Sequence, residues 1–173
     1  MTDAVELGFW DFSLAVYGGP GVADACIALQ DEFGVDVNIL LYLSFRAANG
    51  VRLSAEDVAL LDQNVVDWRS QIVGPLRHVR RHLKQMVAMD VFDGAGDLRE
   101  QIKTVELESE RLQQQALDRL GSTLSGQADN VANALETNYR HYGEHLGCEL
   151  PPDALQTLSR QVMNLAPAAA RRR

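Results

Sequence analysis

A run of basic side chains between Arg69 and Met89 is the feature of this chain that points most directly to binding. The run holds five Arg or Lys residues, two His residues and no acidic residue, although the whole chain has a formal charge of −8. On a helix that turns by about 100° per residue, four of these cations fall on one stripe. A guanidinium group holds two anionic oxygens at once, so the stripe predicts a phosphate, a carboxylate or an acidic protein as its partner. The predicted binding residues are Arg69, Arg77, His78, Arg80, Arg81 and Lys84.

The same stripe also has a purely structural interpretation. The acidic segment from Glu106 to Glu110 offers carboxylates that can pair with these cations inside the same chain. The binding hypothesis therefore requires guanidinium groups that the chain's own carboxylates do not neutralise. Both interpretations stay open on the sequence alone.

A second candidate is a polar pocket at the join of two predicted helices. Gln30, Asp31 and Asn38 bring amide and carboxylate groups to this join, within reach of the basic helix. Asp36 lies between them at a position typical of a helix N-cap, and we interpret it as structural.

The segment from His141 to His145 matches the HxxEH pattern of inverted zinc peptidases. On a helix, His141, Glu144 and His145 share a face that points away from the apolar side, whereas metal sites of helical bundles project inward. His78 and His82 also lie one helical turn apart, but neighbouring cations disfavour a metal there. We therefore predict no metal, no other cofactor and no catalytic residue, with His141, Glu144 and His145 as the residues that a metal would use.

The composition favours a soluble globular protein of 173 residues, with 46% hydrophobic and 23% charged residues. An excess of 24 acidic over 16 basic residues argues against general nucleic-acid binding. No apolar run approaches the roughly 18 residues of a membrane span, and the acidic N-terminus lacks a signal-peptide pattern. Cys26 and Cys148 form no paired motif, which favours reduced thiols and a cytoplasmic location.

Periodicity predicts an all-α fold, because sustained strand alternation is missing from the sequence. Glycines, prolines and capping residues punctuate the first half of the chain, as at Asp36 and at the Ser54–Asp57 capping box. We expect Gly74-Pro75 to interrupt the helical pattern before the basic helix, which ends near Met89. The other helices expected here are 4–17, 22–33, 37–48, which should be the buried centre, and a helix that opens after Ser54 and reaches Trp68 or beyond.

The polar segment from Asp90 to Asp97 marks the best internal boundary. Beyond it, apolar residues at Leu98, Ile102, Val105 and Leu112 alternate spacings of four and three, and residues 124–142 show a similar pattern. This spacing is typical of coiled-coil seams, so we predict that these two segments fold into an antiparallel hairpin. The predicted divisions are a compact helical bundle at 1–92, the hairpin with a short C-terminal helix at 93–166, and a flexible tail at 167–173.

Three blocks of this chain resemble a small bacterial family of uncharacterised helical proteins. The blocks are CIALQDEFGVDVNILLYLSF, DWRSQIVGPLRHVRRHLK and KTVELESERLQQQAL, and the similarity runs from about Phe9 to Leu117. Phe45 stands near a position where the family leads us to expect tryptophan. The resemblance implies a helical fold and no particular activity, and it draws attention to the polar Gln-Asp, Asp-Val-Asn and Trp-Arg positions. The HxxEH segment falls outside it.

We expect a non-enzymatic cytoplasmic adaptor or regulatory protein that binds a protein partner, or itself, through the hairpin and the basic helix face. The alternative is a protein or enzyme that binds a small anionic molecule between the central and basic helices, where Arg77, Arg80 and Arg81 would hold it.

Overall fold

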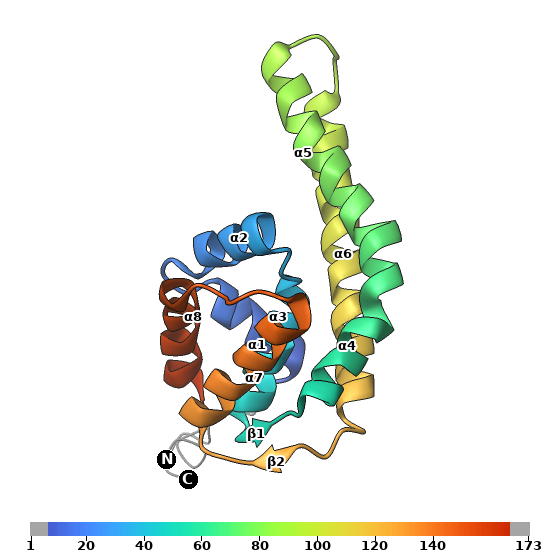
Figure 1. The fold of residues 1–173 in the computed structure, drawn as a ribbon. Helices are drawn as coiled ribbons and strands as arrows, with labels where there is room; N and C mark the ends of the chain where they lie inside the picture. The colour runs from blue at the N-terminus through green and yellow to red at the C-terminus, as the bar shows by residue number, and fades with distance from the viewer. Residues whose placement is uncertain (1–6, 167–173) are drawn as a thin grey trace.

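The computed structural model describes residues 7–166, which fold almost entirely into α-helices (Figure 1). The predicted all-α class is therefore confirmed. In chain order the helices are α1 (Phe9–Tyr17), α2 (Val22–Phe33), α3 (Val37–Ala48), α4 (Ala55–Trp68), α5 (Gly74–Met89), α6 (Ala95–Gly121), α7 (Val131–Leu146) and α8 (Pro152–Leu165). A π-helical turn, η1 (Arg69–Val73), joins α4 to α5. The sequence shows no strand signal, yet β1 (Val51–Arg52) and β2 (Gln127–Ala128) form a short antiparallel pair.

Helix α3 is the buried centre of the helical bundle, as its sequence predicted. Nine of its 12 residues are buried, and α1, α7 and α8 pack against it. Its apolar side chains cover nearly the whole circumference, so a helix of this kind is stable only when it is surrounded. Burial of each large apolar side chain contributes about 1.5–3 kcal/mol. Cys26 of α2 belongs to the same core, and burial raises the pKa of its thiol to about 12.

The predicted helix ends in the first half of the chain are confirmed where local chemistry sets them. Gly34 ends α2 with a positive φ of 69°. The Asp36 side chain accepts a hydrogen bond from the backbone N–H of Asn38 at 2.8 Å and so begins α3. Ser54 and Asp57 exchange the two hydrogen bonds of a capping box at the start of α4. These caps satisfy backbone donors that the first turn of a helix leaves unpaired.

The first helix begins later than the sequence predicts, at Phe9, with Leu7 and Gly8 outside it; the predicted start at Ala4 lies outside the described residues. The final helix, α8, ends at Leu165 as predicted, whereas the predicted tail at 167–173 lies outside the described range. No single helix within residues 7–166 is both long and apolar enough to cross a membrane. The bent pair α1 and α2, which meet at 97°, passes that test by length and composition alone.

The predicted break at Gly74-Pro75 is wrong, because the chain stays helical from Ala55 to Met89. A proline in a regular α-helix collides with the carbonyl four residues before it. Here the turn widens into a π-helix, and the Gly74 N–H donates to the carbonyl of Arg69, five residues earlier. The wider turn accommodates the proline without ending the helix.

The predicted hairpin partners are also wrong. Helix α6 packs antiparallel to α5 and also against α4, while α7 packs on α3 within the bundle (Figure 1). The hairpin turn lies between Met89 and Ala95, where Asp90 and Gly94 both adopt positive φ angles. The predicted boundary at residues 92 and 93 therefore falls between the two arms of one hairpin. The bundle contains the last two helices as well as the first three, and α5 and α6 extend beyond it (Figure 1).

Candidate functional site

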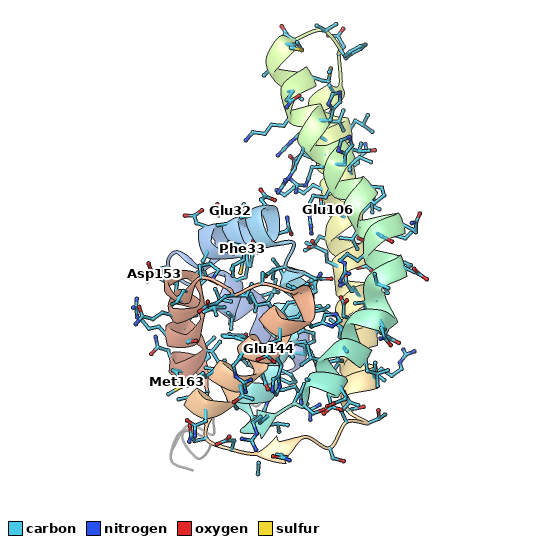
Figure 2. All side chains as sticks on the ribbon, viewed as in Figure 1. Glu32, Phe33, Glu106, Glu144, Asp153 and Met163 are labelled. Carbon is cyan, nitrogen blue, oxygen red and sulfur yellow. The ribbon has the colours of Figure 1, made fainter. Side chains whose placement is uncertain are left out.

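The arginines of α5 lie on the side of the hairpin that faces α2 and the carboxylates of α6. Arg80 pairs through Nε and Nη2 with Glu106, whose side chain is only 6% exposed. Arg77 donates from Nη2 to Glu110 at 2.6 Å and from Nη1 to the side-chain oxygen of Gln30 on α2, also at 2.6 Å. Glu106 lies on the part of α6 that stands beside α2 (Figure 2).

The expectation that this stripe is unneutralised is therefore wrong for its arginines. Arg81 also has an internal partner, because its Nη2 lies 3.1 Å from Asp31 of α2 in a half-exposed pair. Within residues 7–166, Lys84 has no carboxylate in salt-bridge range, and His78 and His82 stack on each other with ring centroids 6.4 Å apart. The hairpin turn brings the acidic segment of α6 against α5, so the internal pairing that the structural interpretation requires is present for Arg77 and Arg80.

Arg69, at the start of η1, is the centre of a partly buried ionic network at the base of the hairpin. Its Nη1 donates to Asp62 at 2.6 Å and to Asp36 at 3.1 Å. His145 of α7 lies 2.9 Å from the other oxygen of Asp62. Burial alone would raise the pKa of Asp62, but the hydrogen bonds from His145 and Arg69 outweigh it and hold that pKa below its ordinary value. The network joins the hairpin to α3 and α7.

The predicted polar pocket residues separate into two places. Gln30 and Asp31 lie on α2 and contact α5, as described above. Asn38 is 6% exposed and lies between α3 and α6, where its side-chain oxygen accepts from Gln114 at 2.9 Å. Gln113, its neighbour on α6, donates to Asp36 at 2.6 Å. These amides fasten α6 to α3, so Asn38 acts as a structural residue.

The HxxEH residues each have a partner other than a metal. The ring Nδ1 of His141 lies 3.0 Å from the Leu53 carbonyl oxygen, Glu144 pairs with Arg140 at 2.9 Å, and His145 contacts Asp62. The described part of the chain contains no group of three or more His, Cys, Asp or Glu side chains placed to hold a metal ion.

Two hollows on the bundle offer space for a ligand. A groove of about 700 Å³ runs between α7 and α8, where Glu144 and Met163 lie on its two walls (Figure 2). Its lining is mainly apolar and includes Leu135, Tyr139 and Leu155. A second, more polar hollow of about 540 Å³ lies near β1 and includes Arg52 and His141. Neither is lined by the arginines of α5.

The side of the hairpin turned away from the bundle is apolar and exposed. Arg77 of α5 and Gln114 of α6 contact the bundle. Val79 and Leu112 are each two residues away from one of them, or about 200° around the helix, so they lie on the opposite side. Apolar residues recur on this side of each helix at seven-residue intervals, three on the α5 arm and three on α6. Five of the six are between 38% and 51% exposed, and the sixth, Met86, is partly exposed. We define this outer face as Ile72, Val79, Met86, Leu98, Val105 and Leu112.

The tip of the hairpin is more exposed still. Met89, Val91 and Phe92, defined here as the tip cluster, are each more than 60% exposed. Helix α5 has no buried residue along its length, apart from the adjoining Val73 of η1. The bundle covers only the opposite side of α5 and α6, so the outer face and the tip cluster form one unpartnered surface within the described residues.

Sequence reasoning identified half of this surface and placed it wrongly. The sequence predicts Leu98, Val105 and Leu112 as a seam buried against residues 124–142, whereas they are 40–51% exposed on α6. Ile72 and Leu112 are each 20 residues from Phe92, and Val79 and Val105 are each 13 residues from it. That symmetry about a polar turn is the signal that identifies α5 as the partner of α6.

Comparisons with known proteins give one match. The model of a family described as proteins of unknown function, DUF2390, matches residues 8–117. This range includes all of α5, α6 as far as Leu117, and Asp36, Asp62 and Arg69, but not His145. No curated protein and no solved structure matches the chain. Because the match covers more than half of the 173 residues, the chain belongs to the DUF2390 family of proteins of unknown function.

Proposed function

We propose that this chain is a non-enzymatic cytoplasmic adaptor or regulatory protein that binds a protein partner through the outer face of its hairpin. The observation that carries the proposal is the double row of apolar side chains, 38–51% exposed for five of its six members, on a projecting pair of helices. Contiguous exposed apolar surface of this kind is typical of protein interaction sites, because water contact with it is unfavourable.

The ionic network at the base supports the proposal by fixing the direction of the hairpin. Arg69 is bonded to Asp36 and Asp62, and Arg77 and Arg81 bond to α2. A hairpin held at several points presents its outer face in one orientation, so less conformational freedom is lost when a partner binds. The arginines thus position the two helices of the hairpin, and the apolar residues of the outer face contact the partner.

Binding of a small anion by Arg77, Arg80 and Arg81 stays a prediction. Its motivating observation was a set of free guanidinium groups, and each of these three groups is bonded to a carboxylate of the chain. An anion at this site would have to displace Glu106, Glu110 or Asp31.

Photo-crosslinking in living cells tests the proposed function. A photoreactive amino acid at Val105, which is 51% exposed on the outer face, is expected to give a discrete covalent adduct with a protein. The same amino acid at Leu14, which is 50% exposed on α1, serves as the matched control and is expected to give none. Equal labelling at the two positions, or no adduct at Val105, would contradict the proposal.

A further inference from the structure

We infer that the partner of the outer face is the outer face of a second copy of this chain, in a symmetric dimer whose two hairpins lie side by side with their tips at the same end. The inference rests on the proposed function and names the partner. A two-fold axis along the hairpin would convert two half-covered helix pairs into a four-helix bundle, which is a common way for helices of this kind to bury their apolar stripes.

The outer face consists of layers, each made of one apolar residue from either arm of the hairpin. A two-fold axis along the hairpin would place each layer against the same layer of the other copy. Residues at equal distance from Phe92 along the chain lie at about the same height on the two arms. The pairs Ile72 with Leu112, Val79 with Val105 and Met86 with Leu98 each meet this condition. Successive layers are seven residues apart, or about 10 Å. Each layer of one copy would therefore meet an identical layer of the other, as in the core of a helical bundle.

The size of the outer face fits a dimer interface. From Ile72 to the tip, and back to Leu112, each arm runs for about 20 residues, or about 30 Å. Two adjacent helices are about 20 Å wide. The face therefore offers about 600 Å² per copy, or about 1,200 Å² for the pair, which is the lower end of the range for specific interfaces.

The polar edges of the face favour the arrangement with both tips at one end. The α5 edge carries His78 and His82, and no acidic residue occurs between Arg69 and Met89. The α6 edge carries Asp97 and Glu108, and Glu108 is paired with Arg111 of the same helix at 2.6 Å. An axis parallel to the helices places α5 of one copy over α6 of the other, so each histidine edge meets an edge that carries carboxylate acceptors. The alternative, with the tips at opposite ends, places the two histidine edges against each other.

The tip cluster gives a second reason for this orientation. Met89, Val91 and Phe92 extend beyond the bundle, where no described element covers them. With both tips at one end, the two clusters lie next to each other and bury their apolar side chains together. With the tips at opposite ends, each cluster would lie near the base of the other hairpin, and the two clusters could not cover each other.

Mass measurement of the 173-residue chain tests the dimer. Light scattering over a dilution series is expected to give twice the mass of the 173-residue chain. Val105→Glu places a charge in the central layer of both copies and is expected to weaken the dimer by at least about 100-fold, with helical circular dichroism unchanged. Leu14→Glu changes an equally exposed residue on α1 and is expected to leave the mass unchanged.

A monomer at every concentration would overturn the inference, and so would a dimer that survives Val105→Glu. A discrete crosslink from Val105 to another protein, found together with a monomeric mass, would contradict the dimer while leaving the proposed function standing. A failure of both measurements would reject both.

Disulfide formation between the two tips tests the orientation of the hairpins in the dimer. In a Cys148→Ser background, Phe92→Cys is expected to form an intermolecular disulfide readily, because the two tips adjoin. The matched control is Asp24→Cys, on α2, which lies outside the interface and is expected to stay reduced. A dimer by mass whose Phe92→Cys form stays reduced would overturn the arrangement with both tips at one end.

Discussion

Replacing Asp36 by Ala removes one carboxylate that accepts three hydrogen bonds from different parts of the fold. One oxygen caps α3 by accepting from the Asn38 N–H at 2.8 Å. The other accepts from Gln113 of α6 at 2.6 Å and from Arg69 of η1 at 3.1 Å. The side chain is 5% exposed, so water cannot easily replace these contacts.

The expected loss follows from these contacts. An N-cap contributes about 1 kcal/mol. Leaving a buried amide such as Gln113 without its acceptor costs about 1 kcal/mol or more, and a hydrogen bond to a charged group contributes about 2 kcal/mol. Arg69 is 29% exposed and keeps Asp62 as a partner, so losing its bond to Asp36 should cost no more than about 2 kcal/mol. Asp36→Ala should therefore lower the free energy of unfolding by about 4 kcal/mol, and Tm by about 12 °C for a chain of this size.

Urea and thermal unfolding, followed by circular dichroism, measure this loss. Asn130→Ala is the matched control, because Asn130 caps α7 through the N–H of Asn133 at 2.9 Å and is not part of the ionic network. It should cost about 1 kcal/mol. If the two variants lose the same stability, the carboxylate of Asp36 acts only as a cap, and the argument that it joins the hairpin to the bundle is refuted.

Two further predictions concern the base of the hairpin and the C-terminal end of α6, where it packs on α3. The folded-state pKa of Asp62 is depressed, so its stabilising effect is fully present above the unfolded value of about 3.9 and is lost as pH falls through the lower folded value. Asp62→Asn should therefore flatten the acid side of the curve of Tm against pH, and an unchanged curve would count against the network. Gly121→Ala should cost about 3 kcal/mol of unfolding free energy, because the new Cβ meets the ring of Tyr42. Gly96→Ala, whose Cβ would have no atom within 4 Å, is its control in equilibrium unfolding and should be neutral or slightly stabilising.

The parts of the fold that the sequence predicted are those set by neighbours in the chain. Gly34 ends α2 because its backbone needs a positive φ, and Asp36 begins α3 through a hydrogen bond two residues away. Helix α3 is central because its own side chains are apolar on nearly all sides. Each of these features depends either on a few consecutive residues or on the side chains of one helix, so a local pattern is enough to predict it.

The pairing of the long helices could not be predicted in that way. The apolar row of α6 has a spacing that suits either neighbour in the chain, and only long-range contacts decide between them. Asn138 makes those contacts for α7: its side chain accepts from the Leu53 N–H at 2.8 Å and donates to the Leu43 carbonyl at 3.2 Å. These bonds hold α7 in the bundle and leave α6 to pair with α5. An asparagine within a helix gives no sign of such distant partners.

The arginines of the basic stripe illustrate the same limit at the candidate site. Their number and spacing suggested binding, and the acidic segment that neutralises them was visible in the sequence, but the choice depended on which helix faced it. The structure places the charged residues on the side of the hairpin that meets α2 and α6, and the apolar residues on the opposite side. The ion pairs that reach from the hairpin to the bundle, Arg81 with Asp31 and Arg69 with Asp36, resist rotation of the helix pair, because rotation would separate their charges. The ion pairs therefore decide which face of the hairpin points outward, and the apolar layers decide what that face can bind.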